Sequence, residues 1–420
     1  MPRAAVFFFL LPLLSSAQTP RDVRLAAKDG QSAIPTVAGY LNSAAVDTRI
    51  EAVKQLTALG GKDSIDPLIR ATHDADPEVQ IRATDGLVNY YLPGYVKTGL
   101  GSSLVRAGAS IKDKFSDNND QIIDPFIIVR PEVISALGQL ARGGSSFDSR
   151  ANACRALGIL RGRAALPDLV EALRSKDNNI MYESLAAIEK IGDPSAGPKI
   201  IFLLRDLDDR VQSTAIETAG TLRATDALPT LRSIVASPRN SRAQRSALMA
   251  IAMMPQPQDR DLFLRQLGSK DDKLRAAAAE GLGRIGDQTD VPALERIWGD
   301  EDRISPRLAT AFALVTDGNL KLTPDSPLRY LINTLNSGGY HDVAYAYLVE
   351  AARRQPVLHV LYTQLDPGTK EEKIYLGRVI AASGDQGSVS FLDKLSRDND
   401  QDVAREGLRS LRSLRARLGI

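Results

Sequence analysis

The feature that most constrains the fold of this chain is a repeat of about 31 residues. Pro167, Pro198 and Pro229 follow one another at this spacing, and each opens an apolar pattern with helical periodicity. Proline is tolerated in the first turn of a helix, because an amide there has no intrahelical acceptor. Pro67 and Pro292 open similar patterns. A fixed period of this length predicts stacked helical units, each burying its apolar face against its neighbours.

A second signature marks the second helix of each unit. An Asp is followed three residues later by an aliphatic residue and, four beyond that, by a small one. The five sets are Asp76/Val79/Ala83, Asp177/Ile180/Ser184, Asp208/Val211/Ala215, Asp271/Leu274/Ala278 and Asp400/Val403/Gly407. The Asp can cap the helix, the aliphatic side chain can begin the buried stripe, and the small residue lets another helix approach. Gly192 and Gly286 stand where second helices are expected to end in a left-handed cap.

These paired signatures resemble the HEAT-like repeats found in phycobilin lyases, over about residues 33–91 and 129–418. The resemblance implies an all-α fold, a right-handed α-solenoid of about eleven HEAT-like helix pairs with one irregular insert. We expect the second helices to line a concave surface. The predicted divisions are a signal peptide at 1–17, an N-terminal segment at 18–32, repeats at 33–91, the insert at 92–128, and repeats with a C-terminal cap helix at 129–420.

Composition narrows the classes of partner. Hydrophobic residues make up 43% of the chain and aromatic residues 5%, which suits helices packed through small and aliphatic side chains. The formal net charge is +2, so no global field attracts nucleic acid or a membrane surface. We therefore expect protein partners, with no nucleic acid and no membrane span.

The N-terminus has the pattern of a secretory signal. Arg3 precedes an apolar run from Ala4 to Leu14, and Ser15-Ser16-Ala17 offers small residues for cleavage after Ala17, with Gln18 as the new N-terminus. The run is too short to span a bilayer, which needs roughly 20 residues. No Cys follows it, which excludes a lipid anchor on a processed cysteine. The predicted location is secreted or periplasmic.

Cys154 is the only cysteine, so the chain can form no internal disulfide and depends on packing outside the cytosol. We expect a buried structural thiol, because Cys154 lies at helical spacing from Leu157 and no His is near it in sequence.

The segment from residue 92 to 128 interrupts the repeat, and long loops inside compact arrays are often functional. It and its flanks concentrate aromatic and basic residues, a mixture typical of binding hot spots. The candidate protein-binding residues are Tyr90, Tyr91, Tyr95, Lys97, Arg106, Lys112, Lys114, Phe115 and Phe126. Two alternatives stay open: an insert that only packs on its own neighbours, and binding on the concave face.

Catalytic patterns are weak throughout. Gly281, Gly283 and Gly286 fit a dinucleotide fingerprint, but they close an expected helix instead of following a strand. The acidic run from Asp398 to Asp402 lacks the Gly and Glu of a calcium loop, so helix capping is the better interpretation. We predict no catalytic, cofactor-binding or metal-binding residues.

The sequence thus predicts an exported, non-catalytic HEAT-repeat scaffold for protein–protein interactions in the periplasm or cell envelope. Two alternatives belong to other classes. One is a lyase-like enzyme with a site near residues 92–128. The other is an anion-binding module that uses the C-terminal arginines Arg405, Arg409, Arg412, Arg415 and Arg417, although the same residues would serve a solubilising terminal cap.

Overall fold

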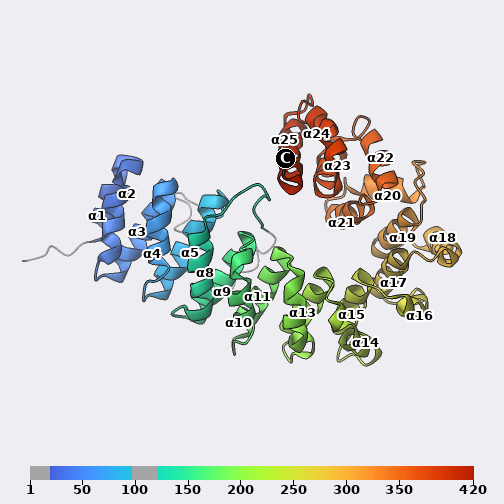
Figure 1. Cartoon of the computed structure of the whole chain (residues 1–420), viewed down its shortest axis with the longest axis horizontal. Coiled ribbons are helices and arrows are strands. Elements are labelled where there is room, and N and C mark those ends of the chain that lie inside the picture. Colours follow the sequence, from blue (N-terminus) through green and yellow to red (C-terminus); the bar gives the residue numbers. More distant parts are fainter. Residues whose placement is uncertain (1–18, 97–120) are drawn as a thin grey trace, which may run out of the picture.

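The computed structural model describes residues 19–96 and 121–420. The predicted signal peptide, with Ala17 and Gln18, and the central part of the insert lie outside the described residues. The described residues form α-helices and short 3₁₀ turns, with no β-strand among them. The helices pair along the chain into a curved solenoid (Figure 1). The predicted all-helical solenoid is therefore confirmed.

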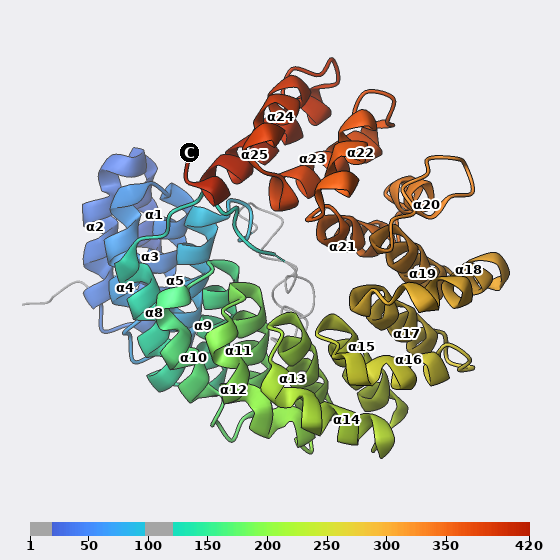
Figure 2. The same ribbon diagram turned by 45° about the vertical axis from the view of Figure 1, so that its right-hand side comes forward.

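One row of helices forms the inner, concave side of the curve (Figure 2). Each helix of this row packs on the next one along the chain. The inner helices are α1 (Pro20–Ala26), α3 (Val46–Leu59), α5 (Pro77–Tyr91), α9 (Phe147–Ile159), α11 (Asn178–Ile191), α13 (Asp209–Thr221), α15 (Ser241–Met253), α17 (Asp272–Ile285), α19 (Ile304–Thr316), α21 (His341–Ala351), α23 (Lys370–Ser383) and α25 (Gln401–Leu418).

A second row covers the outer side. These are the first helices of the pairs: α2 (Ile34–Gly39), α4 (Ile65–Ala71), α8 (Pro131–Gly143), α10 (Leu166–Ala172), α12 (Gly197–Ile200), α14 (Leu228–Ala236), α16 (Arg260–Gln266), α18 (Val291–Asp300), α20 (Pro327–Thr334), α22 (Gln355–Thr363) and α24 (Val389–Leu395). With the inner helices from α3 onward they make eleven pairs within the described residues, the number that the sequence predicts. The second helices line the concave face, also as predicted.

The predicted helix ends are where the signatures put them. All five signature Asp side chains accept hydrogen bonds from amides in the first turn of a second helix: α5, α11, α13, α17 and α25. Gly192 and Gly286 end α11 and α17 with φ of 67° and 70°, where glycine has no steric penalty. The prolines differ slightly. Pro167, Pro198, Pro229 and Pro292 are the second residue of their helices, because the preceding 3₁₀ turn runs directly into each helix.

Neighbouring inner helices approach one another through glycine. A Cβ atom on Gly158, Gly220 or Gly283 would lie 2.8, 2.9 or 2.5 Å from the Cα of an alanine on the next inner helix. The alanines are Ala187, Ala250 and Ala313. In the same helix as Gly283, Gly281 lies against the Phe263 ring. The glycines that imitate a dinucleotide fingerprint are therefore packing and capping residues.

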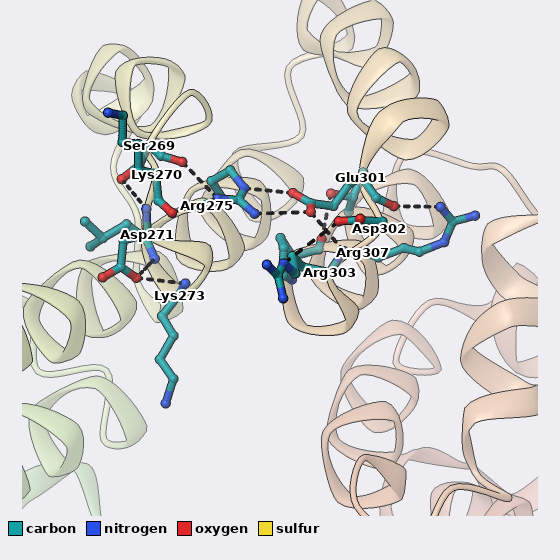
Figure 3. A network of polar contacts seen from close by, with 12 residues as sticks. Ser269, Lys270, Asp271, Lys273, Arg275, Glu301, Asp302, Arg303 and Arg307 are labelled. Carbon is teal, nitrogen blue, oxygen red and sulfur yellow. Dashed lines mark hydrogen bonds and ion pairs between the residues drawn. The ribbon is translucent and has the colours of Figure 1, made fainter.

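An arginine on many inner helices ties one repeat to the next, and Figure 3 shows one case in α17. Arg275 donates to the carbonyl oxygens of Ser269 (2.9 Å) and Lys270 (3.3 Å), before α17. Its other nitrogens donate to both carboxylate oxygens of Glu301, at 2.7 and 3.1 Å, after the next outer helix. Glu301 also accepts from the backbone amide of Arg303 (3.0 Å). One guanidinium thus spans two successive repeats.

We predict that Gly283→Ala destabilises the protein by about 1–3 kcal/mol, because the new methyl group would meet the backbone of α19. Gly299→Ala is the matched control. Gly299 lies in α18, nothing lies within 4 Å of a Cβ there, and alanine favours the helix by up to about 1 kcal/mol. Urea unfolding checks both variants. Equal stability of the two would contradict this packing.

We predict that Arg275→Gln lowers the free energy of unfolding by about 1–3 kcal/mol at neutral pH, because the Glu301 carboxylate is left buried without its ion pair. The Arg275 and Glu301 side chains are only 17% and 8% exposed. Arg303→Gln, at a side chain that is 72% exposed, is the control and should change the free energy by less than about 0.5 kcal/mol.

The loss of unfolding free energy in Arg275→Gln should depend on pH. Burial opposes ionisation of Glu301, but the Arg275 and Arg303 hydrogen bonds keep its pKa below the usual range. A lowered carboxylate pKa contributes stability above the unfolded pKa of about 4.3, and this stability is lost as the pH falls through the folded pKa. The difference between Arg275→Gln and wild type should therefore shrink below about pH 4. A difference that stays constant between pH 7 and pH 3 would rule out this linkage.

Candidate functional site: the concave face

The described ends of the insert are attached to the inner helices. The buried Ile123 donates its backbone N–H to the carbonyl of Ile159 at the end of α9 (3.0 Å). The backbone N–H of Arg130 donates to the Tyr91 hydroxyl at the end of α5 (3.1 Å). The Lys190 ammonium of α11 donates to the Gln121 carbonyl (3.4 Å). Residues 121–130, on the C-terminal side of the insert, thus lie against α5, α9 and α11.

The aromatic residues predicted for binding have different environments. Tyr91 is 7% exposed and belongs to the core, so it is a packing residue. Tyr90 is partly exposed, with its ring 4.9 Å from that of Tyr91 in an edge-on arrangement. Tyr95 is half-buried, and burial raises its pKa well above the usual value. Phe126 is half-buried too. Of the other candidates, Lys97, Arg106, Lys112, Lys114 and Phe115 lie outside the described residues.

A buried polar cluster lies between α9 and α11. Arg155 donates to both carboxylate oxygens of Glu183, at 3.2 and 2.5 Å, and both side chains are almost fully buried. Beside them the Ser184 hydroxyl donates to the Cys154 sulfur (3.2 Å). Burial raises the pKa of the Cys154 thiol to about 12. Cys154 is fully buried, as predicted.

A second polar cluster joins inner helices that are not neighbours. Arg284 of α17 donates to both carboxylate oxygens of Glu350 on α21, at 2.8 and 2.7 Å. It also donates to the Ala252 carbonyl (3.0 Å) and contacts Glu280. The Tyr347 hydroxyl donates to Glu280 (2.7 Å). Burial opposes ionisation of Glu350, but Arg284 and Arg223 hold its pKa below the usual range. This cluster reaches past α19.

A hollow of about 440 Å³ opens beside Arg284. Its lining combines apolar surface from Met253, Met254 and Phe312 with three more arginines. These are Arg223, Arg353 and Arg354, near the ends of α13 and α21. The arginines there can offset the negative ends of the helices, and they can also receive carboxylates. The hollow suits an acidic side chain with an apolar neighbour.

Comparison with known proteins agrees with this geometry. A family model described as HEAT repeats matches residues 134–218, 183–252, 198–272 and 239–315. Residues 134–315 of the chain therefore consist of HEAT repeats. The phycocyanobilin lyase subunit alpha of Nostoc sp. (strain PCC 7120) is 33% identical over 153 residues, which are 33% of this chain and 55% of the relative. The chain thus spans about half the length of that curated relative.

Solved structures include similar solenoids. The complex of CpcE and CpcF of phycocyanin lyase from Nostoc sp. PCC7120 contains a chain that is 22% identical, with a TM-score of 0.37, covering 60% of this chain and 86% of its own. Importin beta is 15% identical with a TM-score of 0.39, covering 95% of this chain and 60% of its own.

Acidic groups near the C-terminus of the chain have structural partners. Within residues 19–96 and 121–420, no three His, Cys, Asp or Glu side chains come together as a metal-binding group. Asp398 and Asp400 pair with Lys373 and Lys370, and Asp400 caps α25, so the acidic run serves capping as predicted. None of the helices in the described part of the chain is long and apolar enough to cross a membrane.

Proposed function

We propose that this HEAT-repeat protein is an exported, non-catalytic scaffold that binds a protein partner on its concave face. The observation that carries the proposal is the set of arginines around the hollow beside Arg284. Stacking of repeats uses Arg284 itself, whereas Arg353 and Arg354 are exposed and line the hollow. Arginine next to apolar surface is a combination enriched at protein interfaces. The insert adds to the same face, because its described C-terminal part and Arg130 after it lie on α5, α9 and α11.

The non-catalytic part of the proposal rests on the residues that could do chemistry. The single thiol is buried and neutral, and a nucleophilic cysteine needs the thiolate. The glycine motif is used for helix packing.

Phycocyanobilin lyase activity is the alternative, and the specific observation in its favour is the 33% identity to a lyase subunit. Titration with phycocyanobilin, followed by the absorbance of the pigment, separates the two functions. A specific spectral change that saturates at one equivalent would favour the lyase.

Partner capture from a cell-envelope extract tests the scaffold. Immobilised protein lacking residues 1–17 should retain a partner, and the double variant Arg353→Glu/Arg354→Glu should lose it, because two carboxylates would repel an acidic partner surface. The matched control is Arg265→Glu/Arg296→Glu, which makes the same charge change at exposed positions of the outer helices α16 and α18. Equal capture by both variants would remove the concave face as the binding surface.

Export is tested separately. The proposal rests on Arg3, the run from Ala4 to Leu14 and the small residues before Gln18. N-terminal sequencing of protein recovered from the periplasm or medium should begin at Gln18. Protein found in the cytosol with Met1 intact would refute export and leave the binding proposal standing.

A further inference from the structure

The last inner helix contacts a residue from the first half of the chain. Arg409 of α25 donates through Nε to both carboxylate oxygens of Asp124, at 2.9 and 3.0 Å, and through Nη2 at 2.6 Å. The two residues are 285 positions apart. Figure 2 shows the end of α25 beside the segment that leads into α8. The last inner helix therefore meets the segment before α8 across the concave face.

The contact joins two parts that are each held elsewhere. Asp124 follows Ile123, which is buried and bonded to α9. On the other side, α25 packs on α23 and α24. Among the residues that the structure describes, the other hydrogen bonds and ion pairs of α25 stay within it or in the turn that caps it, or go to α23 and the loop after it. The pair of Asp124 and Arg409 is thus the one polar bridge, among the described residues, from α25 to a repeat other than its neighbour.

A row of aromatic and arginine side chains lies next to Arg409. The rings of Tyr345 on α21 and Tyr375 on α23 are 6.3 Å apart. The Arg378 guanidinium lies 5.0 Å from the centre of the Tyr375 ring. Arg378 also pairs with Glu406 on α25 (2.9 Å), which lies 3.7 Å from Arg409. Tyrosine and arginine are the residue types that contribute most to protein interfaces.

The charge of this region favours an acidic partner. Helix α25 contains five arginines and two acidic residues. Without Asp124, the contact that remains for Arg409 is the 3.7 Å approach to Glu406. The side chains of Arg409 and Asp124 are 48% and 23% exposed, and an ion pair so open to water has a small net free energy. A carboxylate from another chain can therefore replace Asp124.

We propose that Arg409, together with Tyr345, Tyr375 and Arg378, forms a docking surface for an acidic segment of the protein partner, and that Asp124 occupies this surface in the closed form of the free protein. The inference rests on the proposed binding function and names the chemistry of the partner. Docking exchanges one carboxylate for another and separates α25 from the segment that leads into α8.

The first experiment needs no partner. Small-angle X-ray scattering at low salt should give a larger radius of gyration for Asp124→Asn and for Arg409→Gln than for wild type. The double variant should show no further increase, because both changes break the same pair. Arg405→Gln is the control on the same helix, since Arg405 pairs, among the described residues, only with Asp402 of its own helix. An unchanged radius for Asp124→Asn would overturn the closed form.

The second experiment tests docking with a defined probe, a fluorescein-labelled peptide of eight residues that alternates Asp and Leu, followed by anisotropy. Asp124→Asn should bind it roughly fivefold more tightly than wild type, as expected when a partly exposed competing ion pair is removed. Asp124→Asn/Arg409→Gln should lose this gain, whereas Asp124→Asn/Arg405→Gln should keep it.

Equal binding by wild type and Asp124→Asn would overturn the docking surface, as would equal binding of a control peptide with Asn in place of Asp. If partner capture on Arg353 and Arg354 succeeds while both of these experiments fail, the scaffold function stands and this inference falls.

Discussion

Close contact between neighbouring inner helices is the constraint on which this solenoid depends. Single helices of this length are marginal in water, so their stability comes from the next repeat. Gly158, Gly220 and Gly283 each let their helix approach the backbone of the following one. At such distances a methyl group decides whether two repeats fit, and the backbone fixes the register. Charged side chains can then be placed accurately enough to bridge repeats, as Arg275 does between the start of α17 and Glu301.

Contacts beyond the neighbouring repeat brace the curvature that arises from the small rotation between successive repeats. A solenoid in which each unit touches only its neighbours resists bending weakly. Arg284 reaches from α17 to Glu350 on α21, past α19. Gly283, the residue before it, lets α17 approach the backbone of α19 closely. The pair draws three inner helices together on the concave side. Gly283 takes part in core packing and Arg284 in shaping the concave face, so two consecutive residues serve both.

The repeat architecture could be predicted because its signals are local. An Asp cap with its aliphatic residue, or a glycine at a helix end, lies within one turn of the structure that it specifies, as at Asp271 and Gly286. The charged pairs could not be predicted in the same way. Arg284 and Glu350, or Asp124 and Arg409, are distant in sequence and look like ordinary solvated residues until curvature brings them together. Tyr91 differs from its predicted role for a related reason. Tyr91 is spaced like an anchor for a partner, but it packs at the end of α5 and supports the insert.

The geometry explains how one partly exposed ion pair can matter in a molecule of 420 residues. Within a repeat, many buried contacts hold each helix, and the loss of one surface pair changes little. The effect of an ion pair is larger when it joins distant repeats of a curved array, because small rotations at every interface add up along the chain. A contact between distant repeats limits the sum of these rotations, whereas a contact inside a repeat limits the rotation at one interface. Asp124 and Arg409 form such a contact between distant repeats. The small net free energy of this ion pair allows another carboxylate to replace Asp124. A deeply buried pair would instead hold α25 against the segment before α8 permanently. The concave face would then be closed to any partner too large to enter from the side.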